Sequence, residues 1–139
     1  FSYKNWDLTV FLSGAFGFDI YNVHDLYYGL QSAPGNVLKK AYDKNAGITT
    51  GLNVLTDYFL EKGDYLKLDV VTLGYRFNNK WLDSIRLYVT GKNLATITGF
   101  SGVDPASYQM NGLTPGTNNG TRNYYPTTTQ LLFGLQLDF

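Results

Sequence analysis

The last nine residues of the chain, 131–139, have an apolar side chain at every second position, which is the pattern of a β-strand with one apolar face. Successive side chains of a strand point to opposite faces, so every second residue shares a face. Chain ends fray in water, so a strand that stays this apolar up to the final residue needs surroundings less polar than bulk water. One face carries Leu131, Phe133, Leu135, Leu137 and Phe139, and the other carries Leu132, Gly134, Gln136 and Asp138.

Three further runs with the same alternation precede this strand, at residues 7–21, 65–77 and 85–98. The second and third runs are joined by a short turn, whereas residues 21–64 and 99–129 form long connections. Connections of this length are uncommon in a compact soluble domain. They are typical of outer-membrane barrels, which have short periplasmic turns and long extracellular loops. The sequence therefore predicts an all-β fold of four antiparallel strands, which belong to a transmembrane β-barrel in the bacterial outer membrane.

Composition removes several other classes of protein. The 139 residues are 44% hydrophobic, which would also suffice for a soluble core, so hydrophobicity alone does not decide. Eleven basic residues balance eleven acidic ones, which gives no general attraction to nucleic acid. The absence of cysteine excludes disulfides and zinc-thiolate sites. Residues 1–4 lack the features of a signal peptide, so we expect the chain to continue upstream.

Three segments carry a family resemblance: DYFLEKGDYLKLDVVTLGYRF at residues 57–77, IRLYVTGKNL with the later GVDP within residues 85–105, and YYPTTTQLLFGLQLDF at residues 124–139. Together they resemble the C-terminal end of SusC/RagA-type TonB-dependent outer-membrane transporters. The resemblance implies a barrel of about 22 strands that is filled by an N-terminal plug. Residues 1–139 would then be a C-terminal fragment of the transmembrane domain that holds its last four strands, and the plug and the remaining strands would lie elsewhere.

The function implied by the resemblance is energy-coupled import of glycans or peptides, without an enzymatic activity and without a cofactor. The implied partners are a SusD-type surface lipoprotein, the rest of the transporter chain, TonB through the missing N-terminal part, and membrane lipid. No nucleic acid is expected. The end of the chain also resembles the C-terminal assembly signal of outer-membrane barrels, here formed by Phe133, Leu135, Leu137 and Phe139.

Two groups of side chains are candidates for contact with cargo or a partner. Arg86, Tyr88 and Lys92 share the inward face of the third strand, where they either contact cargo or, in the interpretation that we prefer, fill the lumen and bond to the plug. The tyrosine pairs in the two long connections could stack on sugar rings, or they could pack loop against loop or against the lipoprotein, and these interpretations stay open. These tyrosines are Tyr27, Tyr28, Tyr124 and Tyr125.

Other functions have weaker support in the residues. The single histidine, His24, has no second metal ligand or nucleophile beside it and is better explained as a solvated loop residue. Glu61 is better explained as part of a charged turn before a strand than as half of a catalytic pair. A hydrolase on a β scaffold would lack a catalytic triad. The main alternative is a soluble all-β carbohydrate-binding module, but a sandwich needs about seven strands and four are visible.

Overall fold

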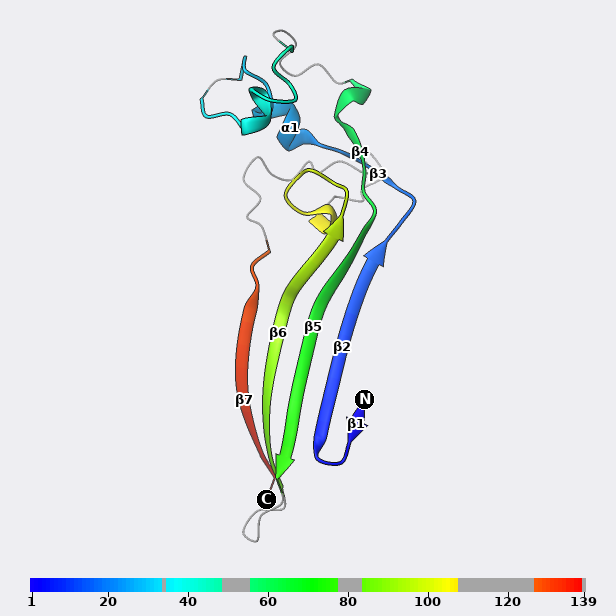
Figure 1. The fold of residues 1–139 in the computed structure, drawn as a ribbon, viewed down its shortest axis with the longest axis vertical. Coiled ribbons are helices and arrows are strands. Elements are labelled where there is room, and N and C mark those ends of the chain that lie inside the picture. The colour runs from blue at the N-terminus through cyan, green and yellow to red at the C-terminus, as the bar shows by residue number, and fades with distance from the viewer. Residues whose placement is uncertain (34, 49–55, 78–83, 108–126, 139) are drawn as a thin grey trace. The chain divides into compact units, whose positions relative to one another are not determined.

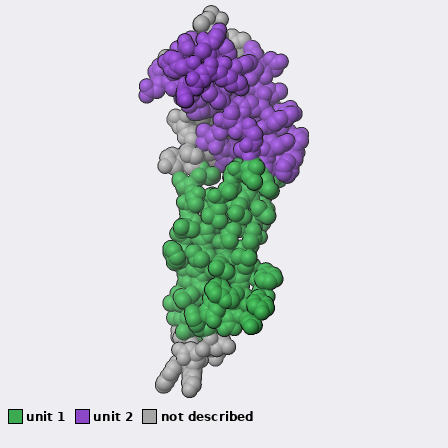
Figure 2. Space-filling view, viewed as in Figure 1, with its two compact units in different colours: residues 1–14, 66–97, 127–139 green, residues 15–65, 98–126 purple. Residues whose placement is uncertain are grey.

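The structure, a computed structural model, describes residues 1–33, 35–48, 56–77, 84–107 and 127–138. The chain divides into two compact units, which are described separately below (Figure 2). Unit 1 consists of Phe1–Gly14, Leu66–Ile97 and Thr127–Phe139, and it holds most of the predicted strand residues. Unit 2 consists of Ala15–Tyr65 and Thr98–Pro126, and it holds most of both long connections.

Unit 1 is a single open sheet of five strands in the order β1-β2-β5-β6-β7. In Figure 1 the arrows of β2, β5 and β6 alternate in direction, as expected for antiparallel neighbours. The four predicted strands are present, and a short strand, β1, is added at one edge through a hairpin with β2. The strands are β1 (Ser2–Tyr3), β2 (Trp6–Ala15), β5 (Tyr65–Phe77), β6 (Ser84–Thr98) and β7 (Gln130–Asp138).

The pairing of β6 with β7 determines which residues share a face. The ladder runs from Ser84 opposite Asp138 to Lys92 opposite Gln130. On one face Ile85, Leu87 and Val89 lie opposite Leu137, Leu135 and Phe133, so every side chain in these pairs is apolar. On the other face Arg86, Tyr88 and Thr90 lie opposite Gln136, Gly134 and Leu132. The alternation predicted for the terminal strand is therefore confirmed in its described residues, and we call the two sides the apolar face and the polar face.

The β6–β7 ladder ends beside a residue whose backbone has the left-handed conformation. Asn93 has φ of 51°, a conformation that asparagine tolerates better than most residues. Its carbonyl oxygen accepts a hydrogen bond from Thr129 Oγ1 at 2.9 Å, and its side-chain Nδ2 donates to the Thr128 carbonyl at 3.2 Å. These two bonds hold the strands together just beyond their last regular pair.

The first predicted strand ends earlier than the sequence suggests. β2 stops at Ala15, and the continuation of the run forms β3 (Asp19–Tyr21), which pairs with β4 (Leu60–Lys62) in a separate sheet of unit 2. Gly17 between them has φ of 80°, where a side chain would be strained, and its N–H donates to Asp64 Oδ1 at 2.6 Å. The break between β2 and β3 thus falls at a residue that alternation alone does not mark as the end of a strand.

The rest of unit 2 consists of short helical turns around a small core. They are α1 (Val23–Tyr28) and the 3-10 helices η1 (Lys39–Ala41), η2 (Asp57–Phe59) and η3 (Pro105–Ser107). Leu26, Leu30 and Phe59 are buried together, and Tyr21 and Ile48 pack against them. Over the described part of the chain, no helix has the length and apolarity needed to cross a membrane.

Candidate functional site

The polar face of unit 1 is organised by an ion pair that reaches across a strand. Arg86 on β6 donates from Nε to Asp7 Oδ1 at 2.8 Å and from Nη2 to Asp7 Oδ2 at 2.5 Å. Asp7 lies on β2, so the pair spans the intervening strand β5. A bidentate arginine–carboxylate pair fixes both side chains in orientation as well as in position. The sequence predicts Arg86 as a candidate, whereas no sequence pattern marks Asp7.

Gly74 on β5 provides the space for this ion pair. A Cβ atom at Gly74 would lie 2.5 and 2.7 Å from the carboxylate oxygens of Asp7 and 2.8 Å from Arg86 Nε. Such contacts are too short for any side chain, so the pair lies directly over the backbone of β5. Glycine in a strand interior often marks such a close approach. This is a signal that the sequence contained, since Gly74 interrupts a run of larger residues.

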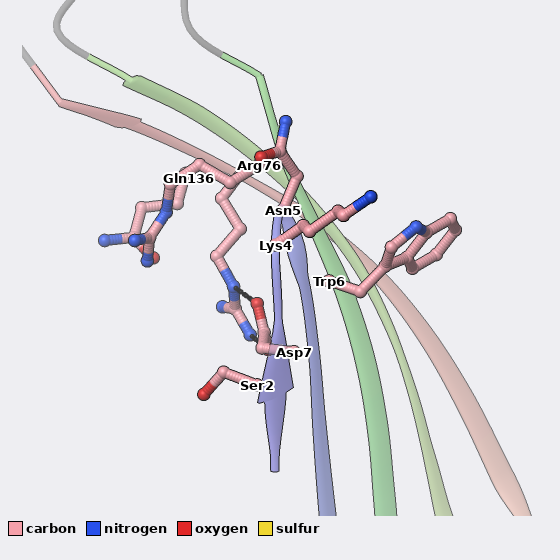
Figure 3. A pocket seen from close by; sticks show the side chains of 8 residues that line it. Ser2, Lys4, Asn5, Trp6, Asp7, Arg76 and Gln136 are labelled. Atoms are coloured by element: carbon pink, nitrogen blue, oxygen red, sulfur yellow. Dashed lines mark hydrogen bonds and ion pairs between the residues drawn. The ribbon is translucent and has the colours of Figure 1, made fainter.

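A cavity of about 460 Å³ lies beside the ion pair (Figure 3). Its lining includes three basic side chains, Lys4, Arg76 and Arg86, and a single acidic one, Asp7. Because Asp7 already pairs with Arg86, the cavity keeps an excess of positive charge at neutral pH. Gln136 of β7 also lines it. The cavity is therefore suited to an acidic or hydrogen-bond-accepting group.

Tyr88 continues the polar face beyond the ion pair. Its ring lies over Gly134 of β7, where a Cβ atom would collide with the ring carbon Cζ. The Arg86 guanidinium carbon lies 5.0 Å from the centre of the same ring, within the range of a cation–π contact. The structure thus brings two of the three candidate residues of this strand together. The third, Lys92, is exposed and lies beyond Thr90, which bonds to Thr72 at 2.9 Å.

The apolar face carries large exposed side chains and an aromatic cluster. The ring of Tyr75 lies 4.7 Å from that of Trp6 and 4.7 Å from that of Phe77, both in edge-on geometry. The described residues of the proposed assembly signal, all in β7, are exposed on this face. They are Phe133 at 83%, Leu135 at 58% and Leu137 at 41%, while Phe139 lies outside the described residues.

Two of the four tyrosine candidates lie in the described part of unit 2. Tyr27 and Tyr28 belong to α1 and are half-buried. The ring of Tyr28 lies 5.1 Å from the ring of His24, so the single histidine packs against an aromatic neighbour. Tyr124 and Tyr125 lie outside the described residues. Within the described residues, no group of three or more His, Cys, Asp or Glu side chains is placed to hold a metal ion.

Comparison with known proteins finds relatives along the whole chain. The sequence is 28% identical over 156 residues to the TonB-dependent receptor P3 of Formosa agariphila and 27% identical over 155 residues to the TonB-dependent receptor SusC of Bacteroides thetaiotaomicron. Each alignment covers 99% of this chain but only 15% and 14% of the two receptors, so the chain spans about one seventh of their length. No protein-family model matches the sequence.

Solved structures show the same fold. The RagAB peptide importer is similar in its closed-closed state, with a TM-score of 0.67 and 19% identity, and in its open-open state, with a TM-score of 0.66 and 20% identity. Both comparisons cover 99% of this chain and 16% of the matched chain. The fold is that of part of a β-barrel. The resemblance to a C-terminal part of SusC/RagA-type receptors is therefore confirmed.

Proposed function

We propose that this chain, which is similar over nearly its whole length to SusC/RagA-type TonB-dependent receptors, contributes the last four strands of the barrel of an outer-membrane importer. In this proposal the complete protein takes up glycans or peptides together with a SusD-type lipoprotein. The plug and the segment that contacts TonB would lie outside residues 1–139. The similarity to receptors and transporters, rather than to enzymes, supports a role in uptake without catalysis.

The observation that carries the proposal is the chemistry of the two faces of one open sheet. Leu87, Phe133 and Leu135 are among the large apolar side chains that stay exposed on one face, where lipid would surround them in a barrel. The opposite face holds the ion pair and the positively charged cavity, which suits a water-filled lumen. Face chemistry of this kind supports insertion in the outer membrane.

A soluble carbohydrate-binding module is not favoured. Such a module would cover its apolar face with a second sheet, as a sandwich does. The described part of unit 1 forms one sheet, and its apolar face stays exposed.

The cargo and partner contacts follow from the same proposal. Arg86, Tyr88 and Lys92 face the lumen, where Arg86 and Tyr88 form a fixed strip that cargo or the plug would meet. The loop tyrosines, Tyr27 and Tyr28 with Tyr124 and Tyr125, are proposed as contacts to the lipoprotein or to cargo, because aromatic side chains bury large areas at modest entropic cost. Peptide cargo is supported by the similarity to a peptide importer, and glycan cargo by the SusC/RagA resemblance.

The test uses the complete receptor gene in a strain that lacks it. Membrane fractionation and the shift in gel mobility between heated and unheated samples report a folded barrel. Uptake of fluorescent oligosaccharides and oligopeptides, with and without TonB, then identifies the cargo class. We expect the protein in the outer membrane, with TonB-dependent uptake of one class and co-purification of a lipoprotein. Recovery of the complete protein in the soluble fraction would contradict the proposal.

A further inference from the structure

Unit 2 contains a cluster of hydrogen-bonded polar side chains, some of them buried and others, such as Ser101 and Tyr58, exposed, that the proposed function does not use. Asn22, Asp25 and Asn45 are 1%, 4% and 0% exposed, which is unusual for such residues unless they are hydrogen-bonded. The cluster draws on both long connections, and we call it the polar cluster. Its members are Asn22, Asp25, Lys40, Asn45, Tyr58, Glu61 and Ser101.

Ser101 is the member that comes from the second long connection. Its backbone N–H donates to Glu61 Oε2 at 2.7 Å, and its hydroxyl donates to Glu61 Oε1 at 2.6 Å. Ser101 Oγ also accepts from Lys40 Nζ at 2.6 Å and from Asn22 Nδ2 at 3.2 Å. One small residue therefore meets three side chains of the first connection and engages both oxygens of a carboxylate.

The side chains of the first long connection that bind Ser101 are held in place by further hydrogen bonds. Asn22 donates from Nδ2 to Glu61 Oε1 at 3.0 Å, and its Oδ1 caps α1 by accepting from the Asp25 N–H at 3.0 Å. Lys40 Nζ pairs with Asp25 Oδ2 at 3.2 Å. Asn45 accepts from the Tyr58 hydroxyl at 2.7 Å and donates to the Gly29 carbonyl at 2.8 Å. Glu61 and Lys40 are thus held in position by contacts that do not involve Ser101.

We propose that Ser101 is a clasp that fastens residues 98–107 of the second long connection to the first, with the Glu61 carboxylate as its main acceptor. Hydrogen bonds to an ionised carboxylate are shorter and about twice as strong as neutral ones, so this contact outweighs the neutral bonds around it. Two other features also hold the segment: Thr98 Oγ1 donates to the Asp64 carbonyl at 2.8 Å, and Phe100 is buried. The clasp therefore governs the part of the segment that follows Phe100.

The clasp depends on the charge of Glu61. Burial raises the pKa of Glu61, but hydrogen bonds from Ser101 and Asn22 and the charge of Lys40 together lower it by more than burial raises it. The pKa of Glu61 therefore lies below its ordinary value of 4.5. Asp25, which pairs with Lys40, is the other acidic side chain of the cluster. A lowered pKa in the folded state gives stability that is present above the unfolded value and lost as the pH falls through the folded value. Acid should therefore open the clasp.

Hydrogen–deuterium exchange of the complete receptor, measured by mass spectrometry, tests the proposal. Ser101→Ala removes the hydroxyl, and Glu61→Gln replaces one carboxylate oxygen by a donor that cannot accept from Ser101. We expect amides of residues 101–104 to exchange about ten to a hundred times faster in both variants. Lys62→Gln is the matched control, because Lys62 neighbours Glu61 but pairs with Asp19 on an exposed surface, and it should leave this exchange unchanged.

Acidification provides a test that needs no substitution. From about pH 7 to about pH 3, wild-type residues 101–104 should lose protection relative to β6 after correction for intrinsic exchange, whereas Glu61→Gln should show no such loss. Protection within twofold of the wild type in Ser101→Ala would overturn the proposal. If neither variant assembles, unchanged wild-type protection of residues 101–104 across this pH range would overturn it as well.

Discussion

Arginine substitutions along β7 measure which face of the sheet contacts lipid. Phe133 and Leu135 lie on the apolar face on either side of Gly134, and Leu132 lies on the polar face opposite Thr90. An arginine that faces lipid near the middle of the membrane costs about 2–4 kcal/mol, and one that faces the lumen costs much less. Phe133 is 83% exposed, so its replacement removes few protein contacts and the loss reports mainly transfer into lipid.

The three positions separate the effect of the face from the effect of depth. At about 3.3 Å per residue and a tilt near 45°, one residue changes the depth by roughly 2 Å, so Leu132 is only about 5 Å from the level of Gly134. If depth alone mattered, Leu132→Arg would therefore lower the unfolding free energy by nearly as much as Phe133→Arg. We expect about 2–4 kcal/mol for Phe133→Arg and Leu135→Arg but about 1 kcal/mol or less for Leu132→Arg.

The assay is guanidinium unfolding of the complete receptor in phospholipid bilayers, followed by tryptophan fluorescence. Heat-dependent gel mobility shows beforehand that each variant has assembled. A cost for Leu132→Arg equal to that of Phe133→Arg would refute the assignment of the two faces. A smooth change of cost along the strand would do the same.

Three further perturbations test other parts of the structure. Gly74→Val should disrupt the ion pair across β5 and lower the unfolding free energy by about 1–3 kcal/mol in the same assay, whereas Gly47→Val, at a site with open space, should have little effect. Tyr88→Ala should destabilise the barrel more than Tyr88→Phe, which keeps the ring over the glycine of β7; equal losses would assign the effect to the hydroxyl. Alanine at both Tyr124 and Tyr125 should weaken lipoprotein capture or cargo uptake while barrel insertion, followed by gel mobility, stays intact.

The strands of the sheet were predictable because each has two chemically different faces. The prediction for residues 65–77 matches β5 at both ends, and that for residues 85–98 differs from β6 by one residue. β1 has only two residues, too few to show alternation. The break at Gly17 is not predictable from alternation, because Phe16, Phe18 and Ile20 keep the pattern. Alternation indicates the apolar side of a strand but not the sheet to which the strand belongs.

The contacts between side chains were harder to predict than the strands. Asp7 and Arg86 are 79 residues apart, and a single sequence contains no signal for their pairing. The sequence favours a charged turn at Glu61, but Glu61 lies in β4 and binds Ser101, which is 40 residues away. Periodicity reports the surroundings of a residue along its own strand, whereas its partner depends on how the connections fold.

The two faces of β7 should differ in the substitutions that they tolerate over evolutionary time. Lipid has no fixed shape, so a position such as Phe133 needs only enough apolar area, and any large aliphatic or aromatic residue supplies it. The next residue, Gly134, lies under the Tyr88 ring, which leaves no room for a single additional carbon. Adjacent positions in this strand are therefore under opposite constraints. Selection acts on the hydrophobicity of residue 133 without regard to its shape, and on the size of residue 134 alone.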